Sequence, residues 1–180
     1  MARADFDYAA QYCEENVARL LDRADLPRPR TAVFIASAGE HVALWHQRAA
    51  QAPGQPVLWD YHVVLLTLAH VPQLWDLDST LPWPCDAARY LRETFAAVDI
   101  DPALRPRFRL LPERLFRAVF ASDRSHMRRE DGTWLAPPPP WPCIQAPGES
   151  MTLPALRDVC APGPGERLDL DAFVARASGR

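Results

Sequence analysis

The sequence contains no lysine: its 180 residues include 20 basic residues, and all of them are arginine. A Schiff-base lysine, the lysine of a phosphate-binding loop and a Ser-Lys dyad are therefore excluded. Asparagine occurs once, as Asn16, and the residues that follow it do not form an N-glycosylation acceptor. The chemistry of the protein must therefore come from other side chains.

Long apolar runs and paired cysteines are also missing. No stretch approaches the ~20 apolar residues of a membrane-spanning helix. Residues 1–7 carry three charges and lead into no apolar segment of the kind found in a secretory signal. No two cysteines are spaced as in a zinc-binding CxxC pair. The four are Cys13, Cys85, Cys143 and Cys160. We predict a cytoplasmic protein with free thiols, no bound metal and no cofactor.

The length fits a single domain, residues 1–180, large enough to bury its own core. The apolar fraction of 48% and the charged fraction of 24% are ordinary for a globular protein. The net charge of −3 gives no drive toward nucleic acid or an anionic membrane. Nothing in the sequence requires more than a monomer.

The hydrophobic pattern predicts an α+β domain: a leading helix, then mostly antiparallel strands, then mixed pieces. The leading helix is expected over residues 11–24, where Val17, Leu20 and Leu21 recur at helical spacing. Strands are predicted over 32–37, 42–45, 57–66, 73–78 and 107–111, and helices over 87–97, 113–120, 153–159 and 168–177. Residues 122–132 are expected to form a loop, and 137–142 a rigid extended proline segment.

The strands over 57–66 and 73–78 are expected to pair as a hairpin. If His62 lies opposite Asp76, the centre of the register falls at Ala69, in the middle of the connection. A carboxylate beside an imidazole fixes its tautomer and stabilises the imidazolium. Asp78 is the alternative partner because it shares the face of Asp76. Strand alternation places Trp59 and Tyr61 together on the opposite face.

Cys13 is a candidate nucleophile, since a thiol at a helix N-terminus has a lowered pKa. Glu14 and Glu15 oppose this effect if they point toward the sulfur. The sequence alone does not place Cys13 near His62. A cysteine, a strand histidine and an aspartate also occur together by chance in many domains, so both a catalytic and a structural interpretation remain open.

Five segments, in order along the chain, resemble the protein N-terminal glutamine amidohydrolase family. They are YCEEN (12–16), WDYHVVLL (59–66), WDLD (75–78), FASDRSHM (120–127) and PPPPWPCI (137–144). The resemblance implies an enzyme that hydrolyses the side-chain amide of an N-terminal Gln, giving N-terminal Glu and ammonia. In eukaryotes the family feeds an N-degron pathway.

The resemblance also implies a papain-like or transglutaminase-like core, an antiparallel sheet flanked by helices in an α/β sandwich. Its triad falls on Cys13 as nucleophile, His62 as base and Asp76 as orienting carboxylate. The partners are then proteins or peptides with a free N-terminal Gln.

Specificity for that substrate requires a group that binds the α-ammonium and a pocket for the side chain. The candidates for the ammonium are Glu14, Glu15, Asp60 and Asp123. Plausible pocket walls are Trp59, Tyr61 and Trp141, and Ser122 in the polar segment is a further candidate. Two rivals are a thiol enzyme that acts on internal bonds or Gln residues, and a non-enzymatic binder of N-terminal Gln.

Overall fold

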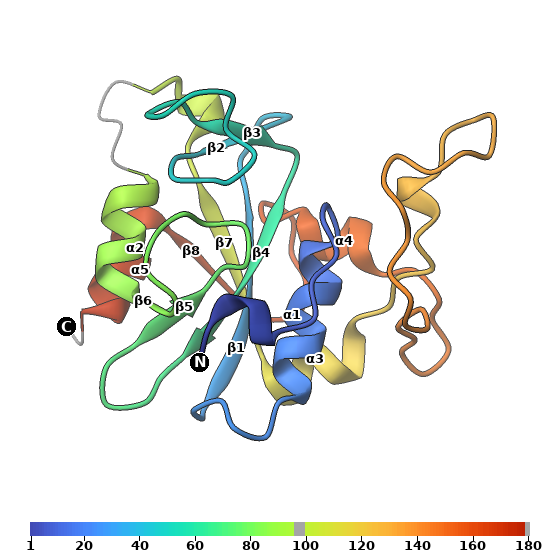
Figure 1. Cartoon of the computed structure of the whole chain (residues 1–180), viewed down its shortest axis with the longest axis horizontal. Coiled ribbons are helices and arrows are strands. Elements are labelled where there is room, and N and C mark those ends of the chain that lie inside the picture. The colour runs from blue at the N-terminus through green and yellow to red at the C-terminus, as the bar shows by residue number, and fades with distance from the viewer. Residues whose placement is uncertain (96–99, 179–180) are drawn as a thin grey trace.

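The computed structural model describes residues 1–95 and 100–178, and at its centre is a six-stranded sheet (Figure 1). The strand order is β6-β5-β4-β1-β7-β8, and each neighbouring pair is antiparallel. The strands are β1 (Arg30–Ala36), β4 (His62–Thr67), β5 (Gln73–Trp75), β6 (Cys85–Asp86), β7 (Arg107–Pro112) and β8 (Glu166–Asp169). A separate two-stranded sheet pairs β2 (Val42–Leu44) with β3 (Val57–Trp59).

Helices cover both faces of the large sheet, as Figure 1 shows. One layer holds α1 (Cys13–Asp22), α3 (Glu113–Val119) and α4 (Leu153–Arg157), and the other holds α2 (Ala87–Thr94) and α5 (Leu170–Ala177). Short 3₁₀ turns occur at Arg3–Asp5, Pro102–Leu104 and Ser125–Met127. The predicted α+β architecture, with helices flanking an antiparallel sheet, is confirmed. No helix of the described chain is both long and apolar enough to span a membrane.

Strand β4 explains why the sheet needs both helix layers. Val63 and Leu65 pack with the apolar side of α1, whereas Val64 and Leu66 pack toward Tyr90 of α2. A strand buried on both faces is a continuous apolar run rather than an alternating one. The apolar run after His62 therefore specifies the central strand of a three-layer structure.

The prediction of one strand over 57–66 is wrong. Strand β3 ends at Trp59 and pairs with β2, whereas β4 begins at His62 and pairs with β1 and β5. The break resets the alternation of side chains. Trp59 consequently packs with the cluster on the α2 side, and Tyr61 packs with the cluster on the α1 side.

The predicted strand over 73–78 ends early, at Trp75. Leu65 pairs with Trp75, so the hairpin is centred at His70, one residue from the predicted position. The predicted direct pairing of His62 with Asp76 is therefore wrong, because Asp76 lies beyond the last paired residue. The Asp76 carboxylate accepts the Asp78 backbone N–H at 2.9 Å, which turns the chain away from the sheet.

The C-terminal prediction missed strand β8. Residues 166–169 pair with β7 as an edge strand, and only Leu168 packs against the core. Its charged neighbours hide the strand pattern, as is common at sheet edges. Helix α5 begins later than predicted, at Leu170, where the Asp169 side chain accepts the Ala172 N–H. The predicted helix over 87–97 runs into residues 96–99, which lie outside the described residues.

Arg109 on β7 is fully buried, and four backbone carbonyls surround its guanidinium. The group donates to the carbonyls of Leu156, Asp158, Ala161 and Pro164 at 2.6–3.1 Å. It thereby ties the segment after α4 to the sheet.

Because Arg109→Met leaves these buried carbonyls without donors, we expect it to lower the free energy of unfolding by about 2–4 kcal/mol. Urea unfolding followed by tryptophan fluorescence measures the change. Arg107→Met, on the same strand but exposed, is the matched control. Equal effects of the two substitutions would contradict this role for Arg109.

Candidate active site

Cys13 lies at the first position of α1, where the helix packs on β4. The thiol is buried, and the backbone N–H of Val63, the residue after His62, acts to lower its pKa. Its proton is directed at Glu14 Oε2, 3.6 Å away. The fold therefore brings Cys13 to the strand position next to His62, a proximity that the sequence did not establish.

The segment before Cys13 is held by Asn16. The amide of Asn16 accepts the Ala9 N–H and donates to the Ala9 carbonyl, both at 2.8 Å. The N-cap residue Tyr12 makes no side-chain capping bond, because its hydroxyl donates to the Ala136 carbonyl instead. The N–H groups of the first turn therefore keep their partial positive charge at the sulfur.

His62 and Asp76 form a buried pair. Nε2 of His62 lies 3.0 Å from Oδ1 of Asp76, and both side chains are almost completely inaccessible. Asp76 also accepts hydrogen bonds from Gln47 at 3.1 Å and Tyr90 at 2.7 Å. The other ring nitrogen, Nδ1 of His62, has no hydrogen-bond partner within residues 1–95 and 100–178. This arrangement leaves Nδ1 available to exchange a proton.

The electrostatics of the pair stabilise the imidazolium that forms when His62 takes up a proton beside Asp76. Burial alone raises the pKa of Asp76, but the charge of His62 and the hydrogen bonds outweigh burial and lower this pKa to about 2. Burial alone lowers the pKa of His62, but the charge and hydrogen bond of Asp76 raise it overall. Asp76 therefore stays ionised, and His62 can hold a proton in a buried site.

Asp78 has a different partner. Its Oδ1 accepts the Tyr8 hydroxyl at 2.5 Å, and burial raises the pKa of Asp78. Oxygen and nitrogen atoms of His62, Asp76 and Asp78 lie within 4.8 Å of one another, as in some metal sites. Each oxygen of Asp76, however, already accepts two hydrogen bonds. Both lone pairs of each Asp76 oxygen are therefore in use, which leaves none for a metal ion.

Three of the predicted substrate-binding residues, Glu14, Trp59 and Tyr61, lie around Cys13 and His62, whereas Asp60 lies at the surface. Glu14 is buried, and its Oε2 accepts the Tyr61 hydroxyl at 3.0 Å. Burial raises the pKa of Glu14 to about 7. The Trp59 ring stacks on the His62 ring with centroids 5.2 Å apart. Asp60 is exposed and pairs with Arg157 at 2.8 Å.

Glu15 and Trp141 connect α1 to the segment over 120–144, in which Ser122 and Asp123 also lie. Glu15 accepts two hydrogen bonds at 2.7 Å from Arg124 and one at 2.6 Å from the Trp141 indole. Ser122 is buried and pairs with Ile144, whereas Asp123 is exposed and accepts the Ser125 N–H. The contacts of these residues thus run to the loop rather than to Cys13.

Sequence reasoning missed four residues of the site: Tyr8, Gln47, Tyr90 and His126. A signal existed for Tyr90, because a tyrosine on the apolar side of a helix needs a buried partner for its hydroxyl. Gln47 gave no signal, since it lies in an irregular segment bridged to Ser79. His126 looked like a solvated loop residue, but its Nε2 lies 3.4 Å from the Tyr61 hydroxyl and 3.7 Å from Glu14 Oε1.

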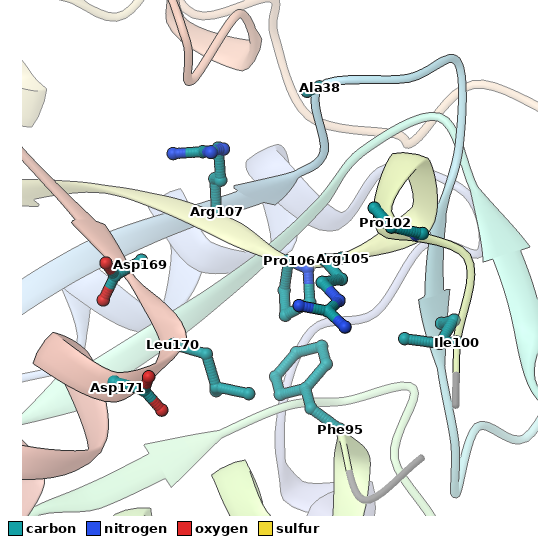
Figure 2. Close-up of a pocket in the computed structure, with 10 residues that line it drawn as sticks. All are labelled: Ala38, Phe95, Ile100, Pro102, Arg105, Pro106, Arg107, Asp169, Leu170 and Asp171. Atoms are coloured by element: carbon teal, nitrogen blue, oxygen red, sulfur yellow. The ribbon is translucent and has the colours of Figure 1, made fainter. Parts of the chain in front are cut away.

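A pocket of about 520 Å³ lies elsewhere in the fold (Figure 2). Phe95 at the end of α2, Arg105 and Arg107 at the start of β7, and Asp169 and Asp171 near the start of α5 contribute to its lining. None of the described residues that line it carries a thiol or an imidazole. The candidate site around Cys13 and His62 lies outside this pocket.

The shifted pKa values predict how Asp76→Asn changes stability with pH. Because the pKa of Asp76 is lowered on folding, this group adds about 2–3 kcal/mol to the free energy of unfolding at pH values above its unfolded pKa, near 4. That contribution is lost as the pH falls toward 2. Because the pKa of His62 is raised on folding, this group stabilises the fold at pH values below its unfolded pKa, near 6.5. That stabilisation is lost as the pH rises through the folded pKa. We expect the stability deficit of Asp76→Asn to be largest between about pH 4 and 6.5.

Urea unfolding at pH 3, 5 and 8 measures that deficit. The exposed Asp171→Asn substitution is the control and should show little deficit at any pH. A deficit of Asp76→Asn that does not change with pH would contradict the ionised pair.

Comparison with known proteins gives the family. The model of the N-terminal glutamine amidase family matches residues 8–176. Similar proteins named protein N-terminal glutamine amidohydrolase occur in Drosophila ananassae, 40% identical over 189 residues, and Drosophila mojavensis, 39% identical over 186 residues. Each alignment covers 95% of this chain and 88% of the relative. The chain therefore belongs to the N-terminal glutamine amidase family.

Proposed function

We propose that this protein deamidates the side chain of N-terminal Gln in proteins and peptides, giving N-terminal Glu and ammonia. The observation that carries the proposal is the buried His62–Asp76 pair at the start of β4, where the neighbouring Val63 N–H interacts with the Cys13 thiol of α1. Family membership supports the substrate, and this geometry supports thiol chemistry. We further propose that residues 1–180 act as one catalytic domain, monomeric and cytoplasmic, without a cofactor.

Cys13 begins the reaction as a neutral thiol. Burial, followed by the charge of Glu14, raises the pKa of the Cys13 thiol. The sulfur therefore needs a base, and Nδ1 of His62 is the ring nitrogen without a partner among the described residues. As the S–H proton passes to Nδ1, the sulfur attacks the side-chain carboxamide carbon of the substrate and a C–S bond forms.

The tetrahedral intermediate then carries its negative charge on the former carbonyl oxygen. N–H groups of the first turn of α1, beginning with that of Cys13, stabilise this oxyanion. The His62 imidazolium returns its proton to the leaving nitrogen, the C–N bond breaks and ammonia departs. Asp76 stays ionised throughout and holds the ring by Nε2.

The second half of the reaction hydrolyses the thioester. A water loses a proton to Nδ1 of His62 as it attacks the acyl carbon. The C–S bond breaks, the sulfur recovers the proton from His62, and the γ-carboxylate of the new N-terminal Glu is released. A thiol at a helix start, paired with an imidazole on an adjacent antiparallel strand, supports the papain-like or transglutaminase-like core.

Ammonia release from a short peptide with a free N-terminal Gln tests the proposed activity. We expect release from that peptide and little from its acetylated form or from a peptide that begins with Asn, which is one methylene shorter. Release from internal Gln would indicate a broader thiol enzyme. A folded, reduced protein that binds the free peptide and leaves it unchanged would indicate a binder.

Replacement of the nucleophile tests the assignment of Cys13. We expect Cys13→Ala to lower kcat/KM by about four orders of magnitude or more, because the variant lacks the sulfur on which the proposed thioester forms. The exposed Cys160→Ala is the matched control and should keep wild-type turnover. Substantial turnover by a folded Cys13→Ala protein would refute the assignment.

A further inference from the structure

We propose that Glu14 binds the substrate's α-ammonium, and that this ion pair makes the free amine a requirement for turnover. The inference rests on the proposed function and identifies one receptor among the carboxylates near the site. Binding of the cation at Glu14 would neutralise a negative charge that lies directly beside the Cys13 sulfur.

The other carboxylates have different roles or surroundings. Both oxygens of Glu15 are occupied by Arg124, and one of them also accepts the Trp141 indole N–H. Asp60 has a side chain that is 57% exposed and already pairs with Arg157, so solvent and a neighbouring cation screen it. Asp123 is exposed and accepts hydrogen bonds within its own loop.

Glu14 differs from these carboxylates in having a buried oxygen without a donor. Its Oε2 accepts the Tyr61 hydroxyl, whereas its Oε1 accepts no hydrogen bond from any described residue. A buried carboxylate oxygen without a partner is costly, so it favours a ligand that donates to it. A primary ammonium supplies such a donor and also the opposite charge.

His126 covers this oxygen in the free protein. Its Nε2 lies 3.7 Å from Oε1, too far for a hydrogen bond, and its side chain is 15% exposed. Rotation of the ring, whose Nε2 also lies 3.4 Å from the Tyr61 hydroxyl, would open Oε1 to the substrate. The incoming ammonium would then take the place of the ring edge beside Tyr61.

The span of the substrate agrees with this placement. The α-nitrogen and the side-chain carboxamide carbon of an extended Gln lie ~5 Å apart, across four bonds of ~1.5 Å. Oε2 of Glu14 lies 3.6 Å from the Cys13 sulfur. An ammonium within hydrogen-bond distance of the Glu14 carboxylate therefore leaves the carboxamide within reach of the sulfur.

The ion pair would also affect the nucleophile. Besides burial, the charge of Glu14 raises the pKa of the Cys13 thiol. A bound ammonium cancels that charge, so the sulfur ionises more readily when the correct substrate is present. An acetylated substrate brings no cation and leaves the charge in place. The free amine is therefore expected to increase kcat as well as binding.

The experiment compares kcat/KM for a free and an acetylated N-terminal Gln peptide in three variants. Glu14→Gln keeps the shape and removes the charge, Asp60→Asn tests the rival receptor, and the exposed Glu40→Gln is the matched control. We expect Glu14→Gln to lower the rate with the free peptide by about 10- to 100-fold. We expect no comparable loss with the acetylated peptide, so the preference for a free amine collapses.

A second readout requires no turnover. Alkylation of Cys13 by iodoacetamide, located by peptide mass spectrometry, reports how readily the sulfur ionises. Without a neighbouring negative charge, Cys13 should be alkylated about 10-fold faster or more in Glu14→Gln than in wild type. Because no peptide is present, this readout stands even if the wild type proves not to be an amidohydrolase.

Several results would overturn the proposal. They are a wild-type preference retained in Glu14→Gln, a loss of preference in Asp60→Asn instead, and unchanged alkylation of Cys13. If Glu14→Gln does not fold, Glu14→Asp replaces it, because the shorter side chain withdraws the charge from the ammonium. A wild-type preference retained in Glu14→Asp would then overturn the proposal.

Discussion

The hydrogen bond between His62 and Asp76 is the constraint on which the rest of the site depends. Four groups converge on the Asp76 carboxylate: the imidazole of β4, the Tyr90 hydroxyl of α2, the Gln47 amide and the Asp78 N–H. The Asp78 N–H belongs to the same turn, whereas the other three groups lie 14 to 29 residues from Asp76 along the chain. The carboxylate therefore links β4 to α2 and holds the imidazole ring in place.

The first turn of α1 supplies the opposite side of the site with three consecutive buried polar residues. Asn16 holds the chain that leads to Cys13, Glu15 anchors the loop that carries Arg124, and Glu14 meets Tyr61. Such residues are seldom fully buried unless they are paired. Here the helix turn directs each of them to a different neighbour, so Cys13 lies within a rigid frame.

Much of this frame could be predicted from the sequence because it depends on local patterns. Helix α1 and strand β4 follow from the spacing of apolar residues such as Leu20 and Val64. His62 contacts Asp76 despite the error in the predicted register, because the chain turns directly after β5, at Asp76, and brings the carboxylate to the ring. Contacts that depend on tertiary packing could not be predicted from the sequence, and those of Gln47 and His126 are the clearest cases.

Strand β8 and the break between Trp59 and His62 show a further limit. The edge strand is mostly charged. At the break the chain passes from one sheet to the other, and the apolar pattern of the sequence does not mark the change. Both depend on what lies beside the segment rather than on its own composition. The position of Glu14 is similar: its neighbours in sequence suggest a solvated helix start, and only packing against β4 buries it.

Trapping the acyl-enzyme tests the central claim most directly. A peptide with a free N-terminal Gln would be mixed with the protein and quenched in acid within milliseconds, and the digest would be mapped by mass spectrometry. The account predicts that the digest peptide containing Cys13 gains the mass of the substrate minus ammonia. It also predicts that this adduct decays as the substrate peptide with N-terminal Glu is released. Turnover with no adduct at Cys13, or with an adduct at another residue, would contradict it.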